Sequence, residues 1–115
     1  MDFICWPTVA ASSIEAYRPA SGGIPGFANA LLVTTLKRGS LYRVPLSADG
    51  LKVAGPIERY FQTDNRYRDL AISPDGKSIY VATDTGGLHE ALGGGVSDQV
   101  ANSGAILVFT YTGQN

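Results

Sequence analysis

Hydrophobic and polar residues alternate in short runs along most of the chain, and these runs are rich in Val, Ile, Leu, Thr and Tyr. Alternation with a period of two is typical of β-strands that bury one face. Glycines and prolines separate the runs, and no long segment keeps a helical period free of both. The pattern therefore indicates an all-β protein. It predicts strands at residues 13–17, 30–36, 40–46, 57–62, 69–73, 78–83 and 105–111.

Two pairs of these strands are predicted to form hairpins. The segment LLVTTLKRGSLYRVPL turns at residues 37–39, and LAISPDGKSIYVAT turns at SPDG. In the second turn, Pro74 presets the first position, Asp75 caps locally, and Gly76 takes a positive φ. Residues 85–104 form a glycine-rich segment that is too long for a tight turn, which indicates a surface or binding loop.

The strands follow one another as a meander. This order predicts a partial β-propeller of about two four-stranded blades, in a single domain over residues 1–115. Two blades cannot close a ring, so we expect their flat faces to remain open. An immunoglobulin-like sandwich is the alternative, although a chain whose single cysteine is Cys5 cannot form the usual internal disulfide of that fold.

Composition narrows the classes of function. Charged residues make up 17% of the chain and the net charge is −1, which gives no basic footprint for nucleic acid or for an anionic membrane. No apolar run reaches the length of a membrane-spanning helix, and the first residues lack the basic start and apolar stretch of a signal peptide. Cys5 is either a small buried hydrophobe or half of a disulfide whose other half is absent.

Three cations are the main candidates for binding chemistry. Arg66 and Arg68 lie at the start of a strand, where alternation directs both side chains to the same face. Lys37 lies in the turn of the preceding hairpin, and successive turns of a meander can meet at one rim of the sheet. Because guanidinium binds carboxylate in a two-pronged manner and lysine adds a point charge, the three would suit a ligand with several carboxylates. The alternative is a solvated basic edge balanced by Asp64 and Asp69.

Other polar and aromatic residues give weaker signals. His89, the sole histidine, lies in the glycine-rich loop, where we expect an exposed polar residue rather than a catalytic base. The spacing of His, Cys, Asp and Glu predicts no zinc or calcium site, and neither a G-x-S-x-G motif nor a phosphate-binding loop is present. Trp6 is either part of the core or an aromatic wall for a planar ligand or a sugar.

The chain resembles the soluble pyrroloquinoline-quinone (PQQ) dependent glucose dehydrogenases, in the glucose/sorbosone dehydrogenase family. The resemblance is carried by ICWPTVAASS, LLVTTLKRGSLYRV, YFQTDNRYRDLAISPDGKSIYVATDTGG and NSGAILVFTY, in that order. It extends over essentially the whole chain, and the combination of LKRG with NRYRD is its most specific part. Members of this family are six-bladed β-propellers several times longer, and this chain resembles their C-terminal part.

The resemblance implies roles for individual residues. Those implied in cofactor binding are Lys37, Arg66, Arg68, Thr8 and Asp84. The three cations among them correspond to the residues that hold the carboxylates of PQQ, a planar tricarboxylate. Trp6 would face the sugar, and Phe3 stands in the same site where close relatives tend to have a tyrosine, which removes a hydroxyl from the pocket. In such relatives the cysteine corresponding to Cys5 follows another cysteine a few residues upstream.

The family oxidises the anomeric carbon of an aldose by hydride transfer to PQQ, with the help of a histidine base and a calcium ion. Nothing in this chain matches the family's histidine base or its calcium site, and His89 lies outside the family's catalytic motif. The resemblance therefore implies the cofactor-contacting C-terminal portion of an aldose dehydrogenase, inactive alone. Its partners would be PQQ, the sugar, and either the missing N-terminal blades or further copies of the chain, at a periplasmic or extracellular location.

A non-catalytic β-module that assembles by edge pairing is the alternative function. Open propeller faces and unpaired strands favour association between chains. Three copies of about two blades each could close a six-bladed ring.

Overall fold

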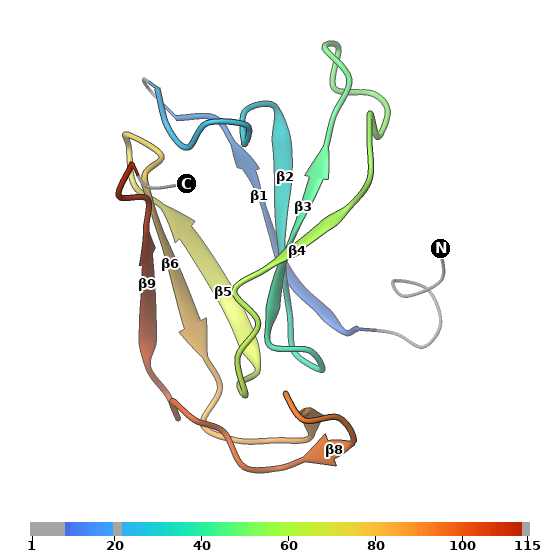
Figure 1. The fold of residues 1–115 in the computed structure, drawn as a ribbon, viewed down its shortest axis with the longest axis vertical. Coiled ribbons are helices and arrows are strands. Elements are labelled where there is room, and N and C mark those ends of the chain that lie inside the picture. The colour runs from blue at the N-terminus through green and yellow to red at the C-terminus, as the bar shows by residue number, and fades with distance from the viewer. Residues whose placement is uncertain (1–8, 20–21, 114–115) are drawn as a thin grey trace.

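A computed structural model describes residues 9–19 and 22–113, and within these ranges it contains β-strands and no helix (Figure 1). The strands are β1 (Ala11–Tyr17), β2 (Ala30–Thr35), β3 (Ser40–Pro45), β4 (Glu58–Tyr60), β5 (Tyr67–Ile72), β6 (Ser78–Thr83), β7 (His89–Glu90), β8 (Val96–Ser97) and β9 (Ile106–Thr110). The prediction of an all-β protein is confirmed.

The strands form three antiparallel sheets. The first sheet has the order β1-β2-β3-β4, and the second has the order β5-β6-β9 (Figure 1). Strands β7 and β8 pair with each other between β6 and β9. Each large sheet takes its strands from one continuous stretch of the described chain, as a meander does. The immunoglobulin-like order, in which strands alternate between the two sheets, is not found in this part of the chain.

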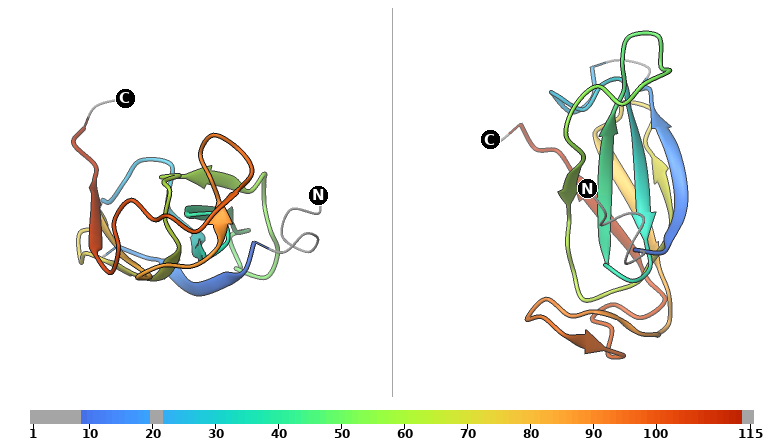
Figure 2. Two further views of the ribbon diagram at one scale, coloured as in Figure 1. Left: turned by 90° about the horizontal axis from the view of Figure 1, so that it is seen from below. Right: turned by 90° about the vertical axis from the view of Figure 1, so that its right-hand side faces the viewer.

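The two large sheets pack together through their inner faces, with β1 beside β5 at the junction (Figures 1 and 2). The alternation along each strand sends one set of apolar side chains inward. The buried cluster consists of Tyr17, Phe27, Leu32, Leu41, Tyr67, Leu70, Ile79 and Val81. Burial of each large apolar side chain stabilises the fold by about 1.5–3 kcal/mol. The core therefore lies between the sheets and joins them into one unit.

A buried tyrosine joins the sheets at the end opposite to the β2–β3 turn. The Tyr17 hydroxyl donates a hydrogen bond to the Gly76 carbonyl at 2.6 Å and accepts one from the Ile24 amide at 2.7 Å. Gly76 has a φ of 74°, and a Cβ there would lie 2.5 Å from the Pro19 Cβ, so no side chain fits. Asp75 accepts hydrogen bonds within the same turn. The predicted roles of Asp75 and Gly76 are confirmed.

Strand boundaries differ from the sequence prediction where the backbone departs from regular pairing. β4 is shorter than the predicted strand at 57–62, because Phe61 has a φ of 57° and leaves the extended conformation. β5 begins at Tyr67, and its register against β6 shifts between Tyr67 and Asp69, which leaves Arg68 as the extra residue of a β-bulge. Strands β7 and β8 were not predicted, since their short segments are rich in glycine and show no alternation.

Candidate functional site

Several turns and strand ends meet at one end of the two large sheets, at the bottom of Figure 1. β2 ends where β3 begins, and β6 ends where β5 begins, because neighbouring strands are antiparallel. The Gly39 carbonyl accepts a hydrogen bond from the Thr63 amide at 2.9 Å, which joins the β2–β3 turn to the segment before β5. We call this end the rim, and define it by residues 36–39, 63–68, 84 and 87–92.

Arg66 and Arg68 share one counterion at the rim, Asp84. Arg66 Nε lies 3.2 Å from Asp84 Oδ2, while Arg68 places Nε 2.8 Å from Oδ1 and Nη2 2.9 Å from Oδ2. The Asp84 amide also donates to the Arg66 carbonyl at 2.9 Å. The hydrogen bonds from Arg68 and then from Arg66 hold the pKa of the Asp84 carboxyl below its usual range, and the same contact raises the pKa of Arg68.

The two arginines differ in exposure. The Arg66 side chain is 19% exposed, whereas that of Arg68 is 57% exposed. Each guanidinium keeps one terminal nitrogen, Nη2 of Arg66 and Nη1 of Arg68, that makes no hydrogen bond to the described residues. These nitrogens are donors still available to an external acceptor. The pair therefore combines a fixed geometry with unused donors.

The carboxylates expected under the alternative interpretation have other partners. Asp69 Oδ1 accepts a hydrogen bond from the Leu70 amide at 2.8 Å. Asp64 Oδ1 accepts one from the Leu92 amide at 2.9 Å. Neither carboxylate forms an ion pair with the two arginines within the described residues, where Asp84 takes that place.

Lys37 lies across the β7–β8 hairpin from the arginine pair. Its carbonyl accepts a hydrogen bond from the Glu90 amide at 2.6 Å. Its side chain is exposed and makes no ion pair within the described residues. It lines a cavity of about 470 Å³ together with Arg38, Leu88, His89, Glu90, Gly95 and Val96. Neither Arg66 nor Arg68 lines this cavity, so Lys37 and the arginine pair do not share one cavity. The hairpin and the Gly39–Thr63 hydrogen bond join the two parts of the rim.

The β7–β8 hairpin is anchored to both large sheets. Arg66 Nη1 donates a hydrogen bond to the Leu88 carbonyl at 2.5 Å. Gly87 has a φ of 129°, and a Cβ there would lie 2.6 Å from Arg66 Nε, so a side chain would be strained and would displace Arg66. On the other side, Glu90 forms an ion pair with Arg38 of the β2–β3 turn at 3.2 Å. The hairpin therefore fixes the position of the arginine pair relative to the β2–β3 turn that carries Lys37 and Arg38.

His89 is buried, and the expectation that it is exposed was wrong. Only 2% of the residue is accessible, because the hairpin folds back over the rim and covers the ring. Nδ1 lies 3.2 Å from the Gly87 carbonyl oxygen, and Nε2 lies 3.5 Å from Asp64 Oδ1 without a hydrogen bond. A glycine-rich sequence carries no sign of such folding back.

Sequence reasoning also missed Asn65, which precedes the arginine pair and is fully buried. Its Nδ2 donates to Thr63 Oγ1 at 2.8 Å and to Asn102 Oδ1 at 3.1 Å, and its Oδ1 accepts from the Asn102 amide at 2.9 Å. These bonds attach the end of the 85–104 segment to the rim. A single asparagine between polar neighbours gives no sequence signal for this role.

Part of the expected site lies outside the described residues. The residues concerned are Phe3, Cys5, Trp6 and Thr8. The chain is described from Val9, whose carbonyl accepts a hydrogen bond from the Lys37 amide at 3.1 Å. Val9 therefore lies beside the rim, next to the turn that carries Lys37.

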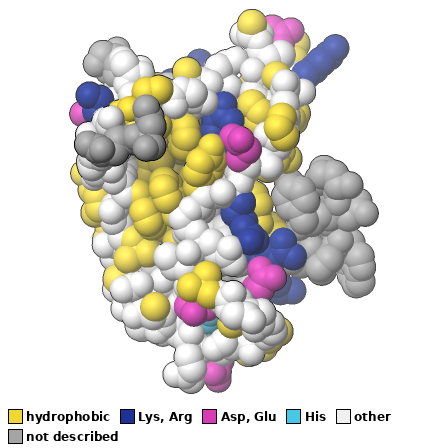
Figure 3. Space-filling view, viewed as in Figure 1, with side chains coloured by type: hydrophobic (Ala, Val, Ile, Leu, Met, Phe, Trp, Pro, Cys, Tyr) yellow, Lys and Arg dark blue, Asp and Glu magenta, His cyan; other side chains and the backbone are white. Residues whose placement is uncertain are grey.

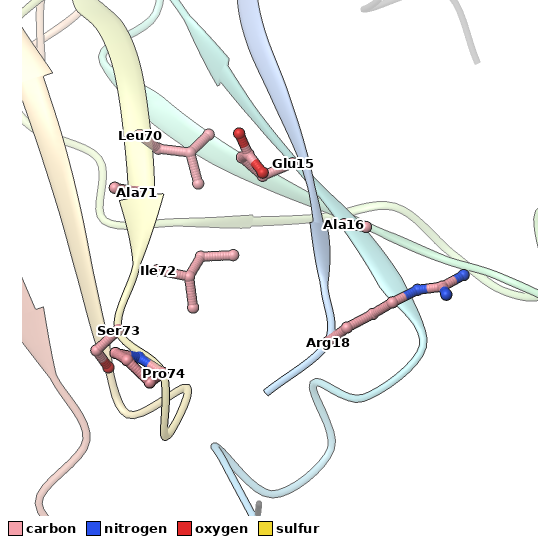
Figure 4. A pocket seen from close by; sticks show the side chains of 8 residues that line it. All are labelled: Glu15, Ala16, Arg18, Leu70, Ala71, Ile72, Ser73 and Pro74. Carbon is pink, nitrogen blue, oxygen red and sulfur yellow. The ribbon is translucent and has the colours of Figure 1, made fainter. Parts of the chain in front are cut away.

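A second cavity, of about 370 Å³, lies between β1 and β5 (Figure 4). Leu70 and Ile72 point from β5 toward β1, whereas Arg18 points away from the cavity. Glu15 is the other charged residue of its lining. Since its polar groups do not converge, this cavity is a weaker candidate site than the rim.

Neither a metal centre nor a membrane-spanning helix is found within residues 9–19 and 22–113. No group of three or more His, Cys, Asp and Glu side chains in these ranges could hold a metal ion. The same residues include no helix long and apolar enough to cross a membrane.

Comparison with known proteins gives a match over most of the chain. The family model for glucose/sorbosone dehydrogenase matches residues 2–90, a range that includes Lys37, Arg66, Arg68 and Asp84. Quinoprotein glucose dehydrogenase B of Acinetobacter calcoaceticus is 41% identical over 111 residues, which cover 96% of this chain and 23% of that protein. The chain thus spans less than a quarter of the length of this curated relative.

Proposed function

Because the chain belongs to the glucose/sorbosone dehydrogenase family, we propose that it is the C-terminal, cofactor-binding portion of a PQQ-dependent aldose dehydrogenase. The complete enzyme would be a six-bladed β-propeller that oxidises the anomeric carbon of an aldose such as glucose by hydride transfer to PQQ. The two meander sheets support this proposal, since they have the strand order of two adjacent blades.

The observation that carries the proposal is the Arg66–Arg68–Asp84 cluster. Two guanidinium groups share a single carboxylate, so the cluster keeps a net positive charge and unused donor nitrogens. A flat molecule with several carboxylates matches these donors, because guanidinium forms paired hydrogen bonds with carboxylate in one plane. Asp84 would hold both arginines in the orientation that binds the ligand.

Lys37 would add a third positive charge from across the hairpin. Its ammonium makes no ion pair within the described residues, and it lines the cavity beside Leu88 and Glu90. The three cations around one hairpin would each bind one of the three carboxylates of PQQ. PQQ would supply the quinone that accepts the hydride, while the residues of this chain would bind its carboxylates and orient its ring system.

Other parts of the reaction are proposed to belong to the rest of the enzyme. The catalytic histidine and the calcium site of the family have no match here, and His89 is buried within the hairpin. Trp6 and Phe3 remain proposed contacts to the sugar, and Thr8 a proposed contact to PQQ. The family also implies a periplasmic or extracellular location.

Titration of PQQ against the isolated chain tests the proposal. We expect Arg66→Ala and Lys37→Ala each to weaken PQQ binding about tenfold or more, since each removes a charge-assisted hydrogen bond worth about 1.5–3 kcal/mol. Lys77→Ala is the matched control, because Lys77 is an exposed lysine in the β5–β6 turn at the opposite end of the sheets. Equal affinity for PQQ in the wild type and all three variants would contradict the proposal.

A second measurement concerns turnover. With PQQ and calcium added, we expect no dye-linked oxidation of glucose by the isolated chain, because it lacks residues that match the family's base and calcium ligands. Robust turnover would show that the chain is a complete catalyst and would refute the assignment as a cofactor-binding portion.

A further inference from the structure

The β7–β8 hairpin places a buried titratable side chain, His89, against the segment that precedes Arg66. The His89 side chain is fully buried, and the Asp64 side chain beside it is 35% exposed. Nε2 of the ring lies 3.5 Å from Asp64 Oδ1 and has no hydrogen-bond partner among the described residues. A buried polar atom without a partner raises the free energy of the folded state, so native proteins rarely keep one.

The other ring nitrogen determines the tautomer of His89. Nδ1 lies 3.2 Å from the Gly87 carbonyl oxygen, which can only accept a hydrogen bond. Nδ1 therefore carries the hydrogen, and in the neutral ring Nε2 keeps a lone pair. The group nearest to that lone pair is an oxygen of Asp64, which is also an acceptor. A proton on Nε2 would turn this unfavourable contact into a charge-assisted hydrogen bond.

Asp64 connects this contact to the arginine pair. Its Oδ1 accepts a hydrogen bond from the Leu92 amide at 2.9 Å, so the carboxylate is already attached to the end of the hairpin. Two residues further on, Arg66 Nη1 donates to the Leu88 carbonyl, next to His89. The ring therefore lies between the two points at which the hairpin is bound to the segment before β5.

Other charged groups lie near the ring, on the β2–β3 turn, β4, the segment before β5 and β7. They are Lys37, Arg38, Arg59, Arg66 and Glu90. Figure 3 shows basic and acidic side chains close together at this end of the molecule. Glu90 forms ion pairs with Arg38 and Arg59, at 3.2 and 3.8 Å, so its charge is already matched. Within the described residues, Asp64 is thus the acid that can pair with a protonated ring.

The hairpin can make the small movement that such a bond requires. A charge-assisted hydrogen bond of about 2.8 Å would draw the ring toward Asp64 by roughly 0.7 Å. At the tip of the hairpin, a Cβ at Gly93, Gly94 or Gly95 would meet nothing within 4 Å. No packed neighbour among the described residues therefore opposes a shift of the tip.

We propose that His89 is a positioning residue whose protonated ring bonds to Asp64 and holds the β7–β8 hairpin closed against the segment that carries Arg66. We call the His89–Asp64 contact the latch. Protonation and closure favour each other, and histidine ordinarily changes charge between about pH 5 and pH 8. The stability that the latch contributes is therefore present at the acid end of this range and is lost as the pH rises through it.

The consequence for ligand binding rests on the proposed function, because it assumes that Arg66 binds a carboxylate of PQQ. The closed hairpin keeps Arg66 Nη1 on the Leu88 carbonyl and leaves Nη2 for the ligand. PQQ should therefore bind more tightly when the latch is closed.

Nitrogen nuclear magnetic resonance of the His89 ring tests the latch in the wild-type chain, without any substitution. Near about pH 8 we expect the ring hydrogen on Nδ1, and near about pH 5.5 we expect hydrogens on both nitrogens. A neutral ring with its hydrogen on Nε2 would overturn the proposal. So would a ring that stays neutral down to about pH 5.

Amide hydrogen exchange measures closure of the hairpin. After correction for intrinsic rates, protection of the Glu90 and Leu92 amides should fall about tenfold between about pH 5.5 and pH 8, because a charge-assisted bond is lost. The Tyr111 amide, bonded to the Lys77 carbonyl at the other end of the sheets, is the internal reference and should not change. Equal protection of the hairpin amides at the two pH values would refute the latch.

Three variants assign the pH dependence to this contact. His89→Gln and Asp64→Asn should each abolish it, since one removes the titrating ring and the other removes the charge of its partner. Asp98→Asn is the matched control, because it neutralises an exposed acid of the same 85–104 segment, and it should keep the wild-type pH dependence. Persistence of the pH dependence in His89→Gln, or its loss in the control, would count against the proposal.

Titration of PQQ at the two pH values separates the latch from the proposed function. In the wild type the affinity should be about tenfold higher at the lower pH, and in His89→Gln it should be nearly the same at both. The same ratio of affinities in the two proteins would overturn the positioning role of His89. Failure of PQQ to bind at either pH would contradict the proposed function, and the ring and exchange measurements would still decide whether the latch exists.

Discussion

Arg68 donates two hydrogen bonds to the two carboxylate oxygens of Asp84, at 2.8 and 2.9 Å, from the bulge near the start of β5 to the end of β6. This two-pronged contact fixes the plane of the guanidinium group. Arg66 uses the same carboxylate at 3.2 Å, so one acid positions both arginines. The bulge therefore brings the two side chains to one counterion.

Replacing Asp84 should reduce stability in a pH-dependent way. The pKa of Asp84 in the folded chain is below its ordinary value of 3.8, so the ionised carboxylate stabilises the fold above that value. The contribution is lost as the pH falls through the folded pKa. We expect Asp84→Asn to cost about 1 kcal/mol near neutral pH, a modest figure because solvent reaches part of the cluster. Urea unfolding should show this difference shrinking below pH 3.8.

Asp98→Asn is the control for this substitution, since Asp98 is an exposed acid of the 85–104 segment. It makes the same change of charge, and its effect should stay within about 0.5 kcal/mol. Equal stability of the two variants near neutral pH would contradict the role assigned to Asp84.

The contact between Tyr17 and Gly76 should contribute to the packing of the two sheets. Tyr17→Phe keeps the ring but leaves the Gly76 carbonyl and the Ile24 amide without their partner. We expect a loss of about 1–3 kcal/mol in the free energy of unfolding. Tyr80→Phe removes a hydroxyl from a residue that is 40% exposed and should have little effect. Chemical denaturation of both variants checks the prediction, which fails if the two behave alike.

Gly39 should be required for assembly of the rim. A Cβ at this position would lie 2.4 Å from the Asn65 carbonyl oxygen and 2.5 Å from that of Thr63, and neither backbone atom can move without shifting the segment before Arg66. We expect Gly39→Ala to destabilise the chain by about 2 kcal/mol or more. Under the proposed function, it should also weaken PQQ binding.

Gly93 provides the comparison, because a Cβ there would meet nothing within 4 Å and its φ is not positive. Gly93→Ala should therefore leave both the melting temperature and PQQ affinity nearly unchanged. The assignment of a close contact at Gly39 would be wrong if its alanine variant melted at the same temperature as the Gly93 variant.

Asn65 should hold the end of the 85–104 segment. Asn65→Ala leaves the backbone amide of Asn102 without its acceptor and removes a fully buried side chain, which should cost about 1–3 kcal/mol and speed exchange of that amide. Gln99→Ala alters an exposed residue of the same segment and should change neither quantity. Exchange measured by nuclear magnetic resonance distinguishes the two, and unchanged protection of Asn102 in the first variant would count against the assignment.

The hairpins and the SPDG turn were predictable because their signals are local. Alternation over a few residues selects a strand, and the positive φ of Gly76 follows from its place in a four-residue turn. The short strands β7 and β8 were not predictable, since they are stabilised by contacts such as the Glu90 amide with the Lys37 carbonyl. A glycine-rich segment has no intrinsic preference strong enough to reveal such contacts.

At the candidate site, too, some features followed from the local sequence and others only from tertiary contacts. The two-residue spacing of Arg66 and Arg68 was enough to expect them together, and they share Asp84, although the β-bulge at Arg68 rather than regular alternation sets their geometry. By itself, then, the sequence determined the all-β class, the main strands and the pair of arginines. Only the tertiary structure decided that Asp84 balances that pair and that His89 is buried beneath a hairpin. Both outcomes depend on packing between residues about 16 to 25 positions apart, where backbone preference no longer determines which groups meet.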